Sequence, residues 1–409
     1  MDGQCIKLFL LGCMQEHGFY QSGGAYGFRD QLQDTLGLKY LDIEKMKKQI
    51  IKHASHQFIE GDVEHWWHEE TKRGIRTRFS DDRLWLVYLC LEYIKTSGDY
   101  NILEEKIPYL DGAKLEYGQD EEYDIHEFSK YEETLYEHCI RAIDISLKFG
   151  VNNLPLIGSG DWNDGFSTVG NKGKGESIWL GFFLYDVINR FLNILKKKED
   201  YKKIQEYEAI LEKLKKALNE NGWDEKWYKR AYTDDGKILG SIKNSECCID
   251  SIAQSWSVIS GAGDEEKTHI AINSLEEKLI NNKEGIIKLL DPPFEKSDLE
   301  PGYIKNYLPG VRENGGQYTH AAIWAIIAFT KLNMSEKAYK YFNAINPIEH
   351  SDTKEKEDKY KIEPYVIPAD IYGSGNLLRK RWLELVYWFF KLVLCCRNSI
   401  YTWARNRKR

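Results

Sequence analysis

The residues best suited to chemistry lie in the loop GSGDWNDGF, residues 158–166, where two aspartates flank a tryptophan between glycines. A carboxylic acid that is partly desolvated against an indole can keep its proton near neutral pH and donate it as a general acid. Asp161 and Asp164 are both candidates beside Trp162. The alternative is structural, because an aspartate at this place can cap the helix that follows, and this alternative fits Asp161 best.

A second polar loop, RGIRTRFSDDRLW, carries Arg73 and Arg76 shortly before Asp81 and Asp82. Arginines in a loop can hold phosphate through charge-assisted bidentate hydrogen bonds. Either aspartate is equally well placed to cap the next helix. The pattern therefore leaves a phosphate or sugar site and a capped helix start both open.

A third loop, RENGGQYTH, places Glu313, Tyr318 and His320 around a glycine pair at an expected helix start. A helix N-terminus with a nearby histidine suits an anion. A capped turn with a hydrogen-bonded histidine is the alternative.

The sequence predicts no metal site. His65 and His68 in HWWHEE have no third ligand at a suitable spacing, and Trp66 and Trp67 favour packing or sugar stacking. No phosphate-binding P-loop, dinucleotide fingerprint or GxSxG nucleophile elbow is found in the sequence. We therefore expect no cofactor.

The elements that must position these loops are helices. Apolar residues recur at three- and four-residue spacing in segments 81–100, 134–150, 177–198, 207–222, 319–333 and 335–345, and alternating strands are scarce. Helical hairpins separated by polar, aromatic loops predict an all-α fold, an α/α barrel with its loops at one end. An α-solenoid has a similar pattern, but no fixed-period repeat is present, which favours the closed barrel.

Composition narrows the class of partner. The chain has 409 residues and a net charge of −7 with dispersed lysine and arginine, so neither nucleic acid nor an anionic membrane is expected as a partner. Its 12 Trp and 26 Tyr suit either sugar stacking or a large aromatic core. Eight irregularly spaced cysteines predict reduced thiols, and neither a signal peptide nor a membrane span is predicted. These features predict a cytoplasmic protein.

Together the loops resemble glycoside hydrolase family 94, the inverting glycoside phosphorylases. The resemblance is carried, in order, by FYQSGGAYGFRDQLQD, GDVEHWWHEETKRGIRTRFSDDRLWL, TLYEHCIRAID, GDWNDG, IDSIAQSWSVISGAGD, PGYIKNYLPGVRENGGQYTHAAIWA and EPYVIPADIY. The HWWH and RTRFSDD motifs are most similar to the branch of 1,2-β-oligoglucan phosphorylases and the C-terminal region of cyclic β-1,2-glucan synthases. The resemblance implies an (α/α)6 barrel that cleaves a β-glucosidic bond with phosphate, releases an α-sugar 1-phosphate, and pairs in some members as a homodimer.

The resemblance also implies roles for single residues. It implies that Asp164 is the general acid that protonates the leaving oxygen and that Trp162 lines the sugar site. Further sugar contacts are implied for Arg76 and Asp82 at the cleaved end and for Glu313 and Tyr318 on the leaving side. The phosphate site is implied to contain His320, with Arg73 as a further candidate. Phosphate is itself the nucleophile, so a single carboxylic acid is sufficient, whereas an inverting hydrolase needs an acid and a base.

The two ends depart from the family's pattern. From the sequence we expect the family's N-terminal β-sandwich to be missing, and the Thr-Gly phosphate loop expected after ADIYGSGN does not follow it. Codons can be chosen for residues 379–409 so that a shifted reading frame restores that loop, and residues 1–17 behave likewise. We therefore predict an out-of-frame leader (1–17), a catalytic barrel (18–378) and an out-of-frame tail (379–409), with impaired phosphorolysis.

Two alternatives stay open from sequence. A hydrolase of the same barrel type would need a base opposite Asp164, for which Asp82 is a candidate. A non-catalytic sugar-binding barrel would bind glucan equally well with or without Asp164.

Overall fold

The computed structural model describes residues 24–116, 118–296, 298–361 and 367–373. The segments 1–17 and 379–409 lie outside the described residues, and the frame-shift prediction for them stays a prediction.

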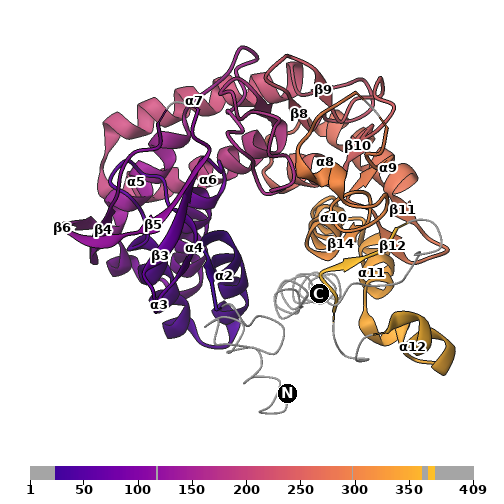
Figure 1. Ribbon diagram of the computed structural model, residues 1–409, viewed down its shortest axis with the longest axis horizontal. Coiled ribbons are helices and arrows are strands. Elements are labelled where there is room, and N and C mark those ends of the chain that lie inside the picture. Colours follow the sequence, from indigo (N-terminus) through magenta and orange to yellow (C-terminus); the bar gives the residue numbers. More distant parts are fainter. Residues whose placement is uncertain (1–23, 117, 297, 362–366, 374–409) are drawn as a thin grey trace.

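In the described part of the chain, paired helices are arranged in a ring around a buried centre (Figure 1). Five pairs of consecutive helices are in contact: α2 (Phe28–Thr35) with α3 (Ile43–Ala54), α4 (Asp82–Ser97) with α5 (Leu135–Ser146), α6 (Ile178–Lys198) with α7 (Tyr201–Glu220), α8 (Ser251–Ile259) with α9 (Glu265–Leu279), and α10 (Thr319–Lys331) with α11 (Ser335–Ala344). The first member of each pair also contacts its neighbour around the ring, in the order α2, α4, α6, α8, α10. This is the hairpin ring that the sequence predicts.

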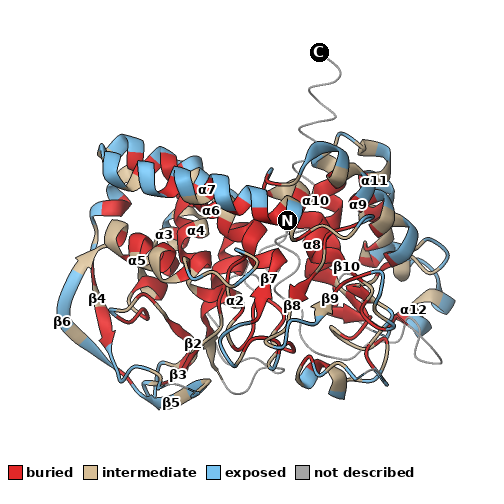
Figure 2. Ribbon diagram, turned by 90° about the horizontal axis from the view of Figure 1, so that it is seen from above, coloured by how far each residue is buried: buried red, intermediate tan, exposed pale blue. Residues whose placement is uncertain are grey.

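Inner and outer helices differ in burial (Figure 2). Nearly every side chain of α10 is buried, whereas α7 buries a single face, as expected for a helix with charged residues on its other side. Inner helix α6 begins where Ser177 accepts a hydrogen bond from the backbone N–H of Leu180, and three lysines occupy its last turn. Among the described helices α6 is long and apolar enough to cross a membrane, but 72% of its most apolar stretch is buried, as in a core helix.

All-α is not confirmed, because strands accompany the helices. One sheet joins β1 (Tyr26–Gly27), β2 (Glu64–His68), β3 (Arg73–Thr77) and β5 (Glu121–Ile125), and β4 (Lys106–Asp111) pairs with β6 (Glu127–Thr134). Two-residue strands complete the loops: β7 (Glu176–Ser177), β8 (Ala231–Tyr232), β9 (Ile238–Leu239), β10 (Ile249–Asp250), β11 (Ile280–Asn281), β12 (Ile286–Ile287), β13 (Leu290–Asp291), β14 (Gln317–Tyr318) and β15 (Asp370–Ile371). The helix α12 (Lys354–Tyr360) and four short 3-10 helices, η1 (Leu36–Tyr40), η2 (Tyr100–Glu104), η3 (Tyr303–Asn306) and η4 (Pro347–His350), make up the rest.

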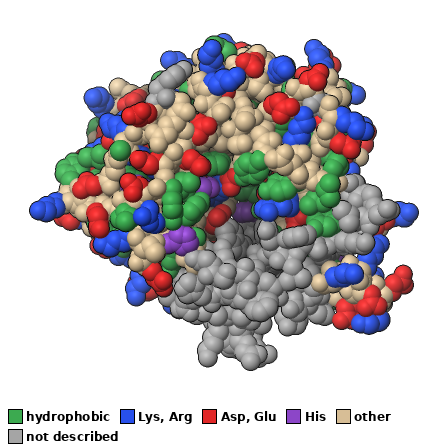
Figure 3. All heavy atoms as spheres, in the orientation of Figure 1, with side chains coloured by type: hydrophobic (Ala, Val, Ile, Leu, Met, Phe, Trp, Pro, Cys, Tyr) green, Lys and Arg blue, Asp and Glu red, His purple; other side chains and the backbone are tan. Residues whose placement is uncertain are grey.

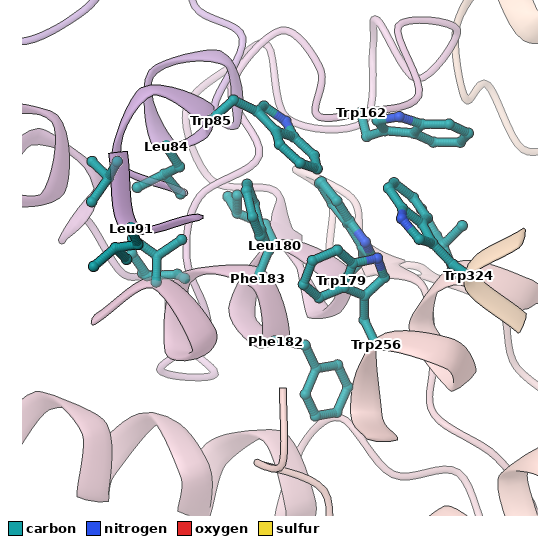
Figure 4. Close-up of a cluster of buried hydrophobic side chains, with 14 of the residues drawn as sticks. Leu84, Trp85, Leu91, Trp162, Trp179, Leu180, Phe182, Phe183, Trp256 and Trp324 are labelled. Carbon is teal, nitrogen blue, oxygen red and sulfur yellow. The ribbon is translucent and has the colours of Figure 1, made fainter. Parts of the chain in front are cut away.

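Tryptophans from four inner helices form the centre of the core (Figure 4). Trp85, Trp179, Trp256 and Trp324 come from α4, α6, α8 and α10, and each is at most 4% exposed. The ring centre of Trp324 lies 5.4 to 6.3 Å from those of the other three, and the rings of Trp179 and Trp256 lie 6.2 Å apart. Of the two roles that the composition left open for tryptophan, these four residues have the core role.

Candidate active site

The expected site residues gather where the inner helices begin. Arg29 lies in the first turn of α2, Asp82 is the first residue of α4, and His320 is the second residue of α10. Arg29 binds Asp81, the residue before α4, and Gln33 of α2 lies 3.4 Å from His320, so the starts of α4 and α10 both lie against α2. Since each helix N-terminus carries a partial positive charge, this end of the ring favours a bound anion.

Arg29 connects Asp164 to the start of α4. Its Nη2 donates to Oδ1 of Asp164 at 2.6 Å, and its Nη1 donates to both carboxylate oxygens of Asp81, at 3.0 and 3.1 Å. Nη1 also lies 3.2 Å from the carbonyl oxygen of Asp161. Burial disfavours the charged guanidinium, but the charges of Asp164 and Asp81 outweigh this and hold the pKa of Arg29 well above its usual value.

Asp82 and His65 form a close pair beside Asp164. His65 Nδ1 lies 2.7 Å from Oδ2 of Asp82, and His65 Nε2 lies 3.8 Å from Oδ2 of Asp164. Burial opposes the imidazolium, but the charge of Asp82 and its hydrogen bond raise the pKa of His65 to about 9. The same pair lowers the pKa of Asp82 against the effect of its burial. His65 is therefore a cation at neutral pH, held beside Asp164 by Asp82.

Asp161 has a different environment from Asp164. Its two carboxylate oxygens accept from both amino groups of Arg230, at 2.6 and 2.7 Å, and Ser177 Oγ donates to it at 2.7 Å. Both partners of the Asp161–Arg230 pair are fully buried, and Asp250 lies 3.4 Å from Arg230 Nε. These contacts fix the loop to the starts of α6 and α8, which is a structural role.

The loop 158–166, which contains Asp161 and Asp164, is also hydrogen-bonded to the RTRFSDD segment. The backbone N–H of Ser80 donates to the Gly160 carbonyl at 3.0 Å, and that of Ser159 donates to the Arg78 carbonyl at 3.3 Å. Gly158 has a φ of +65°, and a Cβ placed there would lie 2.0 Å from the Arg78 oxygen. These two hydrogen bonds, called the join below, hold the residues before α4 against the loop of Asp164.

Aromatic rings form the floor of the site. Trp162 is 7% exposed and packs edge-on against Tyr318 and His320, with ring centres 5.4 and 5.5 Å apart. Below it lies Trp324 of the tryptophan core, at 5.0 Å (Figure 4). Burial lowers the pKa of His320 to about 3, and the charge of Arg29 adds to this, so its imidazole is neutral. A neutral imidazole can donate only one hydrogen bond to an anion.

Glu313 completes the acidic side of the site. Burial raises the pKa of Glu313 to about 7 against the charge of Arg312, and the charge of Asp164 adds to the rise. Burial, with Asp164 and Glu313 adding, also raises the pKa of Tyr303. The site therefore holds a carboxyl group that is partly protonated near neutral pH.

Arg73 and Arg76 have other partners. The Arg76 guanidinium binds both oxygens of Asp62 at 2.7 Å and Glu60 at 2.9 Å. The Arg73 guanidinium lies 5.7 Å from the ring centre of Tyr123 on the outer sheet. In the described part of the chain no hydrogen bond or ion pair joins either arginine to the Arg29–Asp164 pair, and their assignment to sugar and phosphate stays a prediction.

The described residues include no group of three or more histidine, cysteine or acidic side chains suited to a metal ion. His65, one of the two histidines considered for such a site, instead pairs with Asp82. The site lies in a face that is hollowed at its centre, with histidine and acidic side chains at the hollow (Figure 3).

Comparison with known proteins decides the family. A family model described as "Glycosyl hydrolase 94 superfamily, catalytic domain" matches residues 3–381. The chain belongs to this superfamily. Several of its relatives are named as phosphorylases.

Three relatives illustrate the range of this superfamily. The chain is 45% identical over 370 residues to the cyclic β-(1,2)-glucan synthase NdvB of Rhizobium meliloti (strain 1021), covering 90% of this chain and 13% of that protein. It is 29% identical to the solabiose phosphorylase of Paenibacillus borealis, covering 86% of this chain and 42% of that enzyme. It is 25% identical to the 1,2-β-oligoglucan phosphorylase of Listeria innocua serovar 6a, covering 81% and 31%. The chain thus spans less than half the length of these relatives.

Solved structures support the barrel. The glycoside hydrolase family 63 mannosylglycerate hydrolase from Thermus thermophilus, in complex with glucose, superposes with a TM-score of 0.61 at 10% identity, covering 98% of this chain and 99% of that one. A rhamnosidase from Klebsiella oxytoca gives a TM-score of 0.54 at 11% identity, covering 97% and 64%. At these identities the likeness shows the fold alone, which is of the (α/α)6 barrel type.

The sequence did not predict the partners of the two aspartates in the loop 158–166. Arg29 is part of the FRD motif that carried the resemblance, but nothing along the chain connects it with Asp164, 135 residues away. Arg230 lies in the segment KRAYT, which belongs to none of the motifs above. His65 was considered only as a metal ligand.

Proposed function

We propose that this chain is the catalytic domain of an inverting glycoside phosphorylase that cleaves β-glucosides with phosphate to α-glucose 1-phosphate. The observation that carries the proposal is the placement of Asp164, 33% exposed at the centre of converging helix N-termini. A carboxylic acid can protonate the leaving oxygen there, and the helix ends and His320 favour phosphate as the attacking anion.

Sugar-binding roles are proposed for the groups around the acid. Oδ1 of Asp82 and Oε2 of Glu313 are buried and have no hydrogen-bond partner within the described residues, so each can accept from a sugar hydroxyl. Trp162 and Tyr318 supply ring surface next to them. Arg73 and Arg76 remain candidates from the family resemblance only.

We further propose β-1,2-linked glucose oligosaccharides as the substrate. Relatives named for β-1,2-glucan chemistry, a synthase and a phosphorylase, support this linkage, whereas relatives named for solabiose and diacetylchitobiose argue for a wider range. Proposed partners are therefore an oligosaccharide and inorganic phosphate, and a homodimer is proposed as the assembly to test. A cytoplasmic location and the barrel boundaries 18–378 are likewise proposals.

The hydrolase alternative is less well supported. It needs a free base carboxylate opposite the acid, but Asp82 is bound by His65 at 2.7 Å and lies 3.8 Å from Arg29. We therefore favour phosphate as nucleophile.

The test is product analysis with purified chain and β-1,2-linked glucose oligosaccharides, with and without phosphate. We expect α-glucose 1-phosphate only when phosphate is present and only from protein with an intact Asp164. Asp164→Asn should lower turnover by about a hundredfold or more, whereas the exposed control Asp235→Asn should not. Free glucose released equally without phosphate would support the hydrolase. Glucan binding with no turnover in either protein would support the non-catalytic barrel, and a low rate in wild type would agree with the predicted impairment.

A further inference from the structure

Arg29 donates a hydrogen bond to one of the two carboxylate oxygens of Asp164. Its Nη2 lies 2.6 Å from Oδ1 of Asp164, and the arginine side chain is only 6% exposed. Arginine carries five N–H donors and no acceptor, so the oxygen facing it must act as an acceptor. A proton on Oδ1 would point at the N–H of Arg29.

We propose that Arg29 is a positioning residue that fixes the transferable proton of Asp164 on Oδ2. The inference rests on the proposed function, in which Asp164 protonates the leaving oxygen. It assigns a role to a residue for which the family resemblance implied none.

Arg29 is itself rigidly held. Nη1 is bound by both oxygens of Asp81 and by the Asp161 carbonyl, and Trp85 Nε1 in turn donates to Asp81 at 2.9 Å. The guanidinium therefore keeps its position whether or not Asp164 is protonated. Because it is anchored to α4 and to the backbone of the acid loop, it can define the plane of the carboxyl group.

Oδ2 is left for the substrate. Within the described residues no hydrogen bond reaches Oδ2, and His65 Nε2 lies 3.8 Å from it, beyond hydrogen-bond distance. His65 is oriented by Asp82 through its other nitrogen and stacks on Phe79 with ring centres 4.4 Å apart. Oδ2 is thus the oxygen of Asp164 that accepts no hydrogen bond from the described residues.

The reaction balances with one proton on Oδ2. In phosphorolysis the Oδ2–H bond breaks and the proton goes to the glycosidic oxygen as the C1–O bond breaks. A phosphate oxygen forms the new bond to C1. Hydrogen phosphate loses its proton in forming the sugar phosphate, and that proton restores Asp164 over the complete cycle. No oxidant or further reactant is needed.

Substrates with different leaving groups test the proposal. A β-1,2-glucan oligosaccharide needs a proton on its leaving oxygen, whereas β-glucosyl fluoride needs almost none. We expect Arg29→Met to lower kcat/KM for the glucan on the order of a hundredfold while phosphorolysis of the fluoride falls much less. Arg29→Lys, which retains a donor-only cation, should recover part of the glucan activity.

A matched control is Arg190→Met. Arg190 is also an inner-helix arginine bound by two carboxylates, Glu92 at 2.6 Å and Asp186 at 3.3 Å, but within the described residues no hydrogen bond or ion pair joins it to the acid loop. Its loss should lower the rates with both substrates by the same factor. Equal losses on both substrates for Arg29→Met would overturn the proposal, because they would show a merely structural role.

A second measurement does not depend on activity. The urea midpoints of Arg29→Met, Asp164→Asn and the double variant should be non-additive if the two side chains are paired in solution. Additive shifts would overturn the pairing even if a variant folds poorly. Asp164→Asn separates this inference from the proposed function. If Asp164→Asn lowers the rates with the glucan and the fluoride equally, the proposed function fails. If Asp164→Asn retains the fluoride rate but Arg29→Met does not, only the role of Arg29 fails.

Discussion

Asp161 is bound by Arg230 through two parallel hydrogen bonds of 2.6 and 2.7 Å, and neither side chain is exposed to solvent. Three residues further along, Asp164 binds a different arginine and is one-third exposed. The two carboxylates of one loop thus differ in role. Asp161 fixes the loop within the barrel, and Asp164 is partly exposed to solvent.

The first prediction concerns the contributions of Asp161 and Asp164 to stability. Asp161→Asn removes one charge from a fully buried cluster and leaves Arg230 with Asp250, 3.4 Å from its Nε, as its remaining counter-ion, so we expect a loss of about 3 kcal/mol in the free energy of unfolding. Asp164→Asn should cost far less, because Arg29 keeps Asp81 as a partner. Urea unfolding of both variants checks the contrast. Similar losses for the two variants would contradict the structural assignment of Asp161.

The second prediction concerns His65. Its pKa in the folded chain is about 9, against an ordinary value of 6.5, because Asp82 stabilises the imidazolium more than burial disfavours it. A raised pKa stabilises the fold fully below pH 6.5, and that contribution is lost as the pH rises through about 9. His65→Gln should therefore be less stable than wild type at pH 6, by at most about 3 kcal/mol, with a smaller difference at pH 9.5. Thermal melts at both pH values test this, and a constant difference would argue against the His65–Asp82 pair.

The third prediction concerns Glu313, whose pKa is raised to about 7 from an ordinary 4.5, mainly by burial. The unfolded chain loses this proton near pH 4.5 and the folded chain near 7, so the fold becomes less stable as the pH rises between these values. Glu313→Gln stays neutral at every pH. We expect the variant to exceed wild type in stability at pH 8, on the order of 2 kcal/mol, and to match it at pH 4.

Sugar binding provides the complementary measurement for Glu313. If its Oε2 accepts from a sugar hydroxyl, Glu313→Gln should weaken oligosaccharide binding while it stabilises the fold, the usual trade-off at a functional site. A variant that is less stable at pH 8 would show that Glu313 has a hydrogen-bonding role within the fold.

Much of the helical architecture could be predicted because its signals, apolar periodicity and cap residues, lie within each segment of the sequence. Segments 81–100 and 177–198 have helical periodicity and cap residues, and they form α4 and α6 within a few residues of the expected ends. The β2–β3 hairpin was missed because EHWWH and RGIRT do not alternate cleanly between apolar and polar residues. The separate environments of Asp161 and Asp164 depend on arginines 69 and 135 residues away, a distance that no local pattern spans.

The last prediction concerns Gly158, where the acid loop meets the segment before α4. Its φ of +65° is unfavourable for other residues, and an added Cβ would meet the Arg78 carbonyl oxygen at 2.0 Å. Gly173 is a matched control, because its φ is +80° but nothing lies within 4 Å of an added Cβ. Gly173→Ala should cost about 1 to 2 kcal/mol for the backbone conformation alone, and Gly158→Ala clearly more because backbone must also move. Because we expect the join to position Asp164, Gly158→Ala should also lower turnover. This loss should be larger than the decrease in the fraction of folded protein accounts for. Equal unfolding losses for the two variants would show that the loop can shift freely from Arg78, and the join would then have no part in placing the acid.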